Sequence, residues 1–354
     1  MKALVIGLGS MGRRRVRCLR QLGVADVKGF DMRADRRAQA AQEYGIAVRE
    51  QLGAGDLRGF DLVLISTPPD AHHTAIAWSI AAGKPCFVEA SVIRDPLPAL
   101  AQQAQAKGVL VAPSCTLRFH SAIREITQIV QSRRYGKACN FSYHCGQYLP
   151  DWHPWEKVGD YYVSNPLTGG AREIVPFELT WLVDAFGWPV QVQGLKMRTT
   201  DVGAPIDDTY AALLRFDGFV GTLVVDVVAR QAVRKLTLNF ERASLTWDWD
   251  SGVVRVWEAE PGRMVELHQP KSIAHAGYHQ NIGEAMYVAE IAAFLAAAQG
   301  RGTFPHGLQD DIRVLSLLEE IENSAARPPE GAAPLRKRRG EEKAAQRTSL
   351  GEDS

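Results

Sequence analysis

The sequence predicts an α/β fold with a parallel sheet, followed by an α+β fold made mainly of antiparallel strands. Up to Arg118, short apolar runs alternate with helical patterns, which is typical of a parallel sheet covered by helices on both faces. Beyond Arg118, segments of alternating hydrophobicity follow one another between glycine and proline turns, as in antiparallel sheets. A chain of 354 residues also exceeds the length at which one hydrophobic core keeps growing. We therefore expect two domains, at residues 1–118 and 119–326.

The elements of the first domain follow from the spacing of its apolar residues. A short apolar run precedes a segment with helical period, and a second apolar run then ends at Asp31. The same alternation continues as far as Ala112. The expected strands are residues 3–6, 27–30, 62–66, 86–88 and 109–112, and the expected helices are residues 11–22, 36–44, 71–82 and 97–106.

The second domain is expected to open with an amphipathic helix at residues 121–132. Its expected strands are residues 209–216, 220–228, 235–240, 244–249 and 253–257, and its closing helices are residues 284–299 and 308–324. Beyond Arg327 the chain is rich in Pro, Gly, Ala, Lys, Arg and Glu and has almost no large apolar residue. This composition predicts a disordered tail at residues 327–354.

The amino-acid composition indicates which kinds of binding partner to expect. The 41 Lys and Arg residues nearly balance the 40 Asp and Glu residues, so no overall field would hold nucleic acid or an anionic membrane. The first apolar run is too short for a signal peptide, and no later run reaches membrane-spanning length. The 5 cysteines are scattered without a zinc-binding spacing. We therefore expect a cytoplasmic protein with a small-molecule partner, and no metal, nucleic-acid or membrane partner.

Three glycines form the first motif that carries chemistry. Gly7, Gly9 and Gly12 make a G-x-G-x-x-G pattern directly after an expected strand and at the start of an expected helix. In this context the first glycine allows a tight turn, the second lets a pyrophosphate approach the backbone, and the third lets helix and strand pack closely. Ser10 and Met11 join the expected binding residues, because a helix N-terminus offers unpaired N–H groups to an anion. An ordinary glycine turn is the weaker interpretation.

Asp31 ends the second expected strand about twenty residues after the turn, where an acid accepts hydrogen bonds from the adenosine ribose hydroxyls. This position favours NAD as the cofactor. Arg33, Arg36 and Arg37 follow closely, and any of them would neutralise a ribose phosphate, so NADP remains possible. A solvated start of a helix is the alternative interpretation of these arginines.

Two further motifs make a resemblance specific. Residues 66–72 read Ser-Thr-Pro-Pro-Asp-Ala-His, and residues 82–89 read Ala-Gly-Lys-Pro-Cys-Phe-Val-Glu. Together with the glycine turn they resemble the Gfo/Idh/MocA family, named for glucose-fructose oxidoreductase, inositol dehydrogenase and a rhizopine catabolism protein. The resemblance continues to about Ala326. It implies an α/β Rossmann dinucleotide-binding domain, followed by an α+β domain with an open, mainly antiparallel mixed sheet.

The resemblance also implies functional residues and partners. Thr67, Pro68 and His72 would line the nicotinamide side of the cofactor, and Glu89 would close its pocket. Arg118, at the junction of the two domains, would contact a bound molecule or brace the domains. The implied activity is an NAD(P)-dependent oxidation or reduction of a hydroxyl or keto group on a sugar, cyclitol or nucleotide sugar. A homodimer or homotetramer is implied by the resemblance only.

The chain departs from the family where the family carries its acid/base residues. The family's Glu-Lys-Pro motif reads Glu89-Ala90-Ser91 here, so its lysine is missing. Alignment of Gly187 with the glycine that closes the family's catalytic helix places Phe177 on the family's histidine. Alanine cannot polarise an oxygen and phenylalanine cannot transfer a proton.

Another residue must then act as the base for hydride transfer from an alcohol. The candidates are Glu178, our first choice, and Glu173, which flank the vacated position, and Tyr161 or His153 from an aromatic segment at residues 152–162. That segment resembles a substrate-facing loop of relatives linked to surface-sugar metabolism, and a packed loop is an equal alternative. A dinucleotide-binding sensor or partner subunit without hydride chemistry is the second functional hypothesis, and a transient redox step during elimination or epimerisation is the third.

Overall fold

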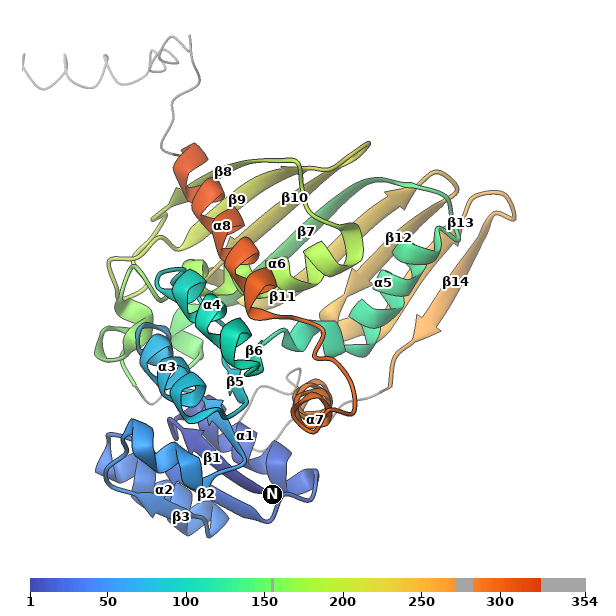
Figure 1. The fold of residues 1–354 in the computed structure, drawn as a ribbon. Helices are drawn as coiled ribbons and strands as arrows, with labels where there is room; N and C mark the ends of the chain where they lie inside the picture. Colours follow the sequence, from blue (N-terminus) through green and yellow to red (C-terminus); the bar gives the residue numbers. More distant parts are fainter. Residues whose placement is uncertain (154–155, 271–282, 326–354) are drawn as a thin grey trace, which may run out of the picture.

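The computed structural model describes residues 1–153, 156–270 and 283–325. These residues form two sheets, a six-stranded one built from the N-terminal part and an eight-stranded one built from the rest (Figure 1). The expected disordered tail at residues 327–354 lies outside the described residues.

The six-stranded sheet has the order β3-β2-β1-β4-β5-β6, and all of its strand pairs are parallel. The strands are β1 Lys2–Ile6, β2 Asp26–Phe30, β3 Ala47–Arg49, β4 Leu62–Ile65, β5 Cys86–Val88 and β6 Val111–Pro113. The strands β4 and β5 are buried along their whole length, because helices cover both faces of the sheet. These helices are α1 Ser10–Gln21, α2 Ala34–Tyr44, α3 His72–Ala82 and α4 Leu97–Lys107. The predicted strand and helix alternation is confirmed.

The eight-stranded sheet has the order β14-β13-β12-β11-β7-β10-β9-β8. Its strands are β7 Ala138–Tyr148, β8 Gln191–Met197, β9 Thr209–Arg215, β10 Val220–Asp226, β11 Val228–Phe240, β12 Ala243–Asp248, β13 Val253–Glu258 and β14 Arg263–His268. The β10 and β7 pair is parallel and all the others are antiparallel, so the sheet is mixed. The predicted fold class, a Rossmann part followed by an open and mainly antiparallel mixed sheet, is confirmed.

Helices cover one face of this second sheet. They are α5 Ser121–Ser132, α6 Ala171–Phe186 and α8 Leu308–Ala325, which lie across the same side of the strands in Figure 1. The helix α8 approaches β8 closely because Gly194 has no side chain, and a Cβ atom there would collide with Ile321. Large apolar side chains of the sheet are exposed, namely Leu195, Met197, Leu213, Trp257 and Met264.

Polar side chains tie the second sheet's helices to the Rossmann part. Arg172, in the first turn of α6, donates to the carbonyl oxygen of Val92 at 2.7 Å and pairs with Glu322 of α8 at 2.9 Å. Arg118 pairs with Asp184 of α6 and donates to the carbonyl oxygen of Pro305 at 2.8 Å. The remaining helix, α7 Ala285–Ala298, packs against α1. The carboxyl ends of the parallel strands are therefore held close to the N-terminal half of α6.

Candidate functional site

The glycine turn has the close contacts that its sequence pattern predicts. Gly7 has a φ of 92°, a left-handed conformation that favours glycine, and a Cβ atom there would collide with the backbone of Ser66. A Cβ atom on Gly12 would collide with the carbonyl oxygen of Gly7. Gly9 differs, because the nearest atom to its Cβ position is Nη1 of Arg36 at 3.4 Å. The turn is therefore tight behind the backbone, whereas in front of Gly9 only the flexible end of a cationic side chain lies near, which fits a dinucleotide pyrophosphate.

Asp31 lies beside this turn at the end of β2. Its Oδ2 accepts a hydrogen bond from the backbone N–H of Leu8 at 2.7 Å, and its Oδ1 accepts one from the N–H of Arg33 at 2.9 Å. These bonds fix the carboxylate in a position where each oxygen retains a lone pair for a ribose hydroxyl. The structure thus brings Asp31 and the glycine turn together, as the sequence predicts.

The three arginines after Asp31 have separate contacts. Arg33 pairs with Asp35 at 2.6 Å and lies 3.9 Å from Glu156. Arg37 donates to the carbonyl oxygens of Asp31 and Met32 at 2.9 and 3.0 Å. Arg36 extends over Gly9, with its Nη1 3.9 Å from Oδ2 of Asp31. Arg36 is thus the arginine placed at the phosphate-binding turn.

Thr67, Pro68 and His72 lie together beyond the carboxyl end of β4. The Nε2 of buried His72 lies 2.9 Å from the carbonyl oxygen of Thr67, and burial lowers the pKa of the histidine. In the described part of the chain, three buried atoms here have no hydrogen-bond partner: Oγ1 of Thr67, Nδ1 of His72 and Oγ of Ser91. A bound ligand or water would satisfy them, as buried polar groups require.

Glu89, at the end of β5, has a buried partner that the sequence analysis missed. Arg15 of α1 is fully buried and donates to both carboxylate oxygens of Glu89, at 2.6 and 2.9 Å. It also lies 3.0 Å from Glu290 of α7, which accepts hydrogen bonds from residues 114–116. Although burial opposes the charge, Glu89 and Glu290 raise the pKa of Arg15. A single Glu inside the apolar α7 pattern was the available signal, since such a residue needs a buried partner.

Glu178 lies between α6 and the second sheet and is completely buried. Its Oε1 accepts two hydrogen bonds from Arg234, at 3.0 and 2.6 Å. Its Oε2 accepts one from Tyr143 at 2.6 Å and one from Trp181 at 3.2 Å. Both oxygens are therefore engaged by protein groups.

Glu173 lies one turn before the Phe177 position. Its Oε1 accepts a hydrogen bond from the hydroxyl of Tyr162 at 2.7 Å. Its Oε2 is buried and has no hydrogen-bond partner among the described residues, and the same holds for the hydroxyl of Tyr161. Burial raises the pKa of Glu173 to about 7, although the Tyr162 hydrogen bond opposes this shift. Burial thus makes this carboxyl group easier to protonate than an exposed glutamate.

His153 and Tyr161 stack on each other, with 4.7 Å between ring centroids. Glu156 lies 3.5 Å from the Nδ1 of His153. Burial lowers the pKa of His153 and raises the pKa of Tyr161 to about 12. The structure therefore brings Glu173, Tyr161 and His153 into one aromatic cluster, whereas Glu178 faces the second sheet.

Two glycines explain how this cluster forms. A Cβ atom on Gly169 would collide with the backbone of Val163, and Gly170 has a φ of 65° just before α6 begins. The turn at Tyr162–Ser164 can therefore rest directly on the start of the helix. This contact places the hydroxyl of Tyr162 beside Glu173.

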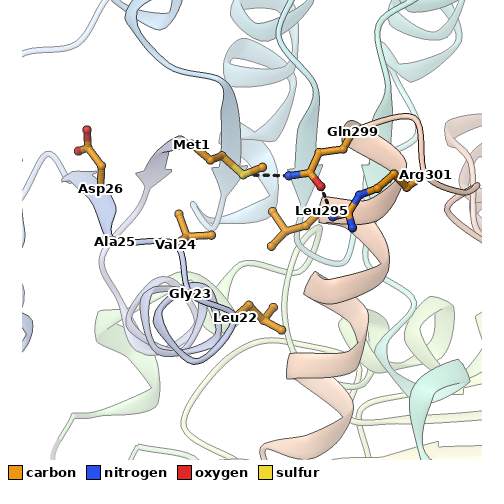
Figure 2. A pocket seen from close by; sticks show the side chains of 9 residues that line it. All are labelled: Met1, Leu22, Gly23, Val24, Ala25, Asp26, Leu295, Gln299 and Arg301. Carbon is orange, nitrogen blue, oxygen red and sulfur yellow. Dashed lines mark hydrogen bonds between the residues drawn. The ribbon is translucent and has the colours of Figure 1, made fainter.

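One surface pocket lies elsewhere. Figure 2 shows it between the C-terminal end of α7 and the segment that leads into β2, where Gln299 bonds to Arg301 and to the sulfur of Met1. Its volume is about 360 Å³. It lies at the amino ends of β1 and β2, opposite the glycine turn, whereas ligands of open parallel sheets bind at the carboxyl ends.

No group of three or more His, Cys, Asp or Glu side chains among the described residues is placed to hold a metal ion. No helix among them has the length and apolar character needed to cross a membrane.

Solved structures with the same two-part fold are similar over nearly the whole chain. An oxidoreductase from Agrobacterium radiobacter in complex with NAD⁺, L-tartaric acid and magnesium has a TM-score of 0.79 and 15% identity, over 92% of this chain and 96% of that one. UDP-N-acetylglucosamine 3-dehydrogenase from Acidithiobacillus ferrooxidans has a TM-score of 0.72 and 20% identity, over 92% and 98%. Levoglucosan dehydrogenase in complex with NADH and L-sorbose has a TM-score of 0.78 and 16% identity, over 92% and 97%.

Part of the second domain is also similar to a known family in sequence. Residues 123–246 match the model of the GFO/IDH/MocA C-terminal domain. No curated protein matches the chain significantly. Residues 123–246 thus resemble the GFO/IDH/MocA C-terminal domain, and the resemblance to the Gfo/Idh/MocA oxidoreductases indicated by the N-terminal motifs is confirmed.

Proposed function

We propose that this protein is an NAD-dependent oxidoreductase that acts on a hydroxyl or keto group of a sugar, cyclitol or nucleotide sugar. The observation that carries the proposal is the open glycine turn beside Asp31, at the strand ends that also bear Thr67 and Glu89. Bound NAD would supply the hydride acceptor or donor. The chain would contribute Gly7, Gly9, Ser10, Met11, Gly12, Asp31, Arg33, Thr67, Pro68, His72, Glu89 and Arg118 around it.

The structural relatives support a carbohydrate substrate. One acts on UDP-N-acetylglucosamine and another is a levoglucosan dehydrogenase crystallised with NADH. The aromatic cluster of His153, Tyr161 and Tyr162 offers the flat apolar faces on which sugar rings stack. A role in surface-glycan metabolism is a further part of the proposal.

The contacts of the site residues distinguish structural residues from candidate acid/base residues. Glu178 is engaged by Arg234, Tyr143 and Trp181, so we assign it a structural role in place of the catalytic one first expected. Arg118, with its partners Asp184 and Pro305, would also brace the two domains beside the bound cofactor. An acid/base group would then come from the cluster around Glu173.

We also propose domain boundaries after residues 118 and 326, and a homodimer or homotetramer. The exposed apolar side chains Leu195, Leu213 and Trp257 support assembly through the second sheet. Light scattering coupled to size exclusion would give twice or four times the monomer mass, and a monomer at micromolar concentration would contradict the assembly.

The function is tested by titration and turnover together. Nicotinamide fluorescence with NADH measures binding, and absorbance at the nicotinamide band with a panel of sugars, cyclitols and nucleotide sugars measures turnover. Binding with turnover supports the dehydrogenase. Binding without turnover on the whole panel would favour a sensor or partner subunit, which the Ala90 and Phe177 positions make the second candidate. No binding would contradict both.

A further inference from the structure

We propose that Glu173 is the catalytic acid/base of this site and takes the hydroxyl proton of the substrate on its Oε2 atom. This inference rests on the proposed function. It assigns to one carboxyl group the task for which the chain has neither the family's lysine nor its histidine, whose positions are Ala90 and Phe177.

Glu173 lies one helical turn before Phe177 on α6. Residues four apart in an α-helix lie on the same face, so Glu173 and Phe177 share one face of α6. Phe177 packs against the core but is only partly buried, so the protein does not cover this face of α6 completely. A longer acidic side chain one turn earlier can therefore reach the space that a histidine at position 177 would serve.

The two carboxylate oxygens of Glu173 have different surroundings. Tyr162 donates to Oε1 and thereby fixes the rotation of the carboxyl group. Oε2 and the hydroxyl of Tyr161 are both buried without a hydrogen-bond partner in the described structure. Buried polar atoms normally have partners, so two such atoms in one cluster indicate a place for a polar ligand.

The electrostatic surroundings of Glu173 also suit proton transfer. The titratable groups around Glu173 are Tyr161 and Tyr162, with Glu156 and His153 beyond Tyr161 and Glu89 beyond Tyr162. Burial raises the pKa of Glu173 to about 7, and the Tyr162 hydrogen bond lowers it again in part. A group with a pKa near the working pH both accepts and returns a proton efficiently.

During oxidation the substrate O–H bond breaks and its proton passes to Oε2 of Glu173, while the C–H electron pair leaves with its hydrogen as a hydride to oxidised NAD. A C=O bond forms, and the carboxylate becomes a carboxylic acid. In the reverse direction the protonated Glu173 donates to the forming alkoxide. The proton returns to solvent after the product has left.

The first test needs no substrate. Oxidised nicotinamide is cationic and reduced nicotinamide is neutral, so a carboxyl group near the ring should ionise when NAD⁺ binds. Calorimetry at pH 7 in two buffers of different ionisation enthalpy should show proton release with NAD⁺ and none with NADH. The variant Glu173→Gln should release none, and the exposed control Glu320→Gln should behave as the wild type.

The second test uses whichever sugar the wild type turns over. Glu173→Gln should lower kcat roughly 10²- to 10⁴-fold with unchanged affinity for NADH, and the rise in kcat/KM with pH near 7 should disappear. Glu173→Asp should recover part of kcat. The glutamine keeps the acceptor for Tyr162, so folding should be preserved, and circular dichroism checks this.

The outcomes separate the two proposals. Absence of NAD⁺ binding would contradict the proposed function itself. Binding of NAD⁺ without proton release, or Glu173→Gln turnover within about twofold of wild type, would overturn the role of Glu173 and leave the function standing. If no sugar is turned over, the calorimetric result alone decides whether Glu173 faces the nicotinamide.

Discussion

Arg15 and Glu89 form a two-point ion pair, with Nε to Oε1 at 2.6 Å and Nη2 to Oε2 at 2.9 Å. Arg15 is fully buried, and its ring contacts are Phe87 at 4.5 Å and Tyr287 at 5.4 Å. Because Glu89 ends β5 at the predicted cofactor site, this pair joins the interior between α1 and α7 to the site.

Replacement of Arg15 by Met should destabilise the protein strongly. It leaves the carboxylates of Glu89 and Glu290 without their buried cation, and the loss of one partner of a buried pair costs about 3–5 kcal/mol. Urea denaturation measures the free energy of unfolding. The exposed Arg20 on the same helix is the matched control, and Arg20→Met should change it by less than about 0.5 kcal/mol. Equal effects at both positions would contradict the buried network.

Arg36 should set the cofactor preference. It extends over Gly9 and lies 3.9 Å from Asp31, so it would meet the 2′-phosphate of NADP. Arg36→Gln should weaken NADPH binding roughly 10- to 100-fold, the value of one charge-assisted hydrogen bond, with a smaller effect on NADH. Fluorescence titrations give both dissociation constants.

The control for that experiment is Arg33→Gln, which removes the same charge from a side chain paired with Asp35 and half exposed. It should leave the ratio of the two dissociation constants within about twofold of wild type. The assignment to Arg36 is wrong if Arg33→Gln shifts the ratio as much as Arg36→Gln does.

The free energy of unfolding should fall on acidification, in part because His120 is buried in its neutral form. Burial, with a contribution from Arg234, lowers its pKa to about 4, whereas an unfolded histidine titrates near 6.5. Between these values the unfolded state binds the extra proton, so the free energy of unfolding falls as pH drops from about 6.5 to about 4. Urea denaturation at pH 7 and pH 5 should show a smaller decrease for His120→Phe than for wild type. The exposed His73 is the control, and His73→Gln should leave the decrease unchanged.

Gly169 should be intolerant of any side chain. A Cβ atom there would collide with the backbone of Val163, and overpacking of this kind costs about 1–3 kcal/mol. Gly169→Ala should lower the free energy of unfolding accordingly, whereas Gly55→Ala, which meets no atom within 4 Å, should change it by less than about 0.5 kcal/mol. Unchanged stability of Gly169→Ala would show that the turn at Tyr162–Ser164 does not rest on α6.

Strong periodicity made most of the fold predictable. The continuous apolar run of β4 and the amphipathic pattern of α5 are local signals, and both elements were predicted within a residue or so. Four strands were not predicted. Three of them, β3, β8 and β14, lie at sheet edges. The fourth is β7, whose open-face residues Asn140, Ser142 and His144 are polar. Such strands are specified by their neighbours more than by their own pattern.

The site was predictable only where a motif fixes the backbone. The glycine turn and Asp31 meet as expected, because the strand order brings the ends of β1 and β2 together. The side-chain partners were not predictable from local pattern. Arg15 and Glu89 are 74 residues apart, and Arg234 and Glu178 are 56 apart. Sequence proximity to Phe177 favoured Glu178, but the direction of its side chain on α6 sends it toward the second sheet.

The central claim, that the open face of the glycine turn binds a nicotinamide dinucleotide, is tested most directly by NADH titration of wild type and Gly9→Val. Gly9 has a φ of −67°, and the nearest atom to its Cβ position is the flexible end of Arg36, so valine should fold there. We predict NADH binding by wild type, at least a tenfold loss of affinity in Gly9→Val, and unchanged affinity in the control Gly53→Ala. Equal NADH affinity of wild type and Gly9→Val, or no binding by wild type, would contradict the account.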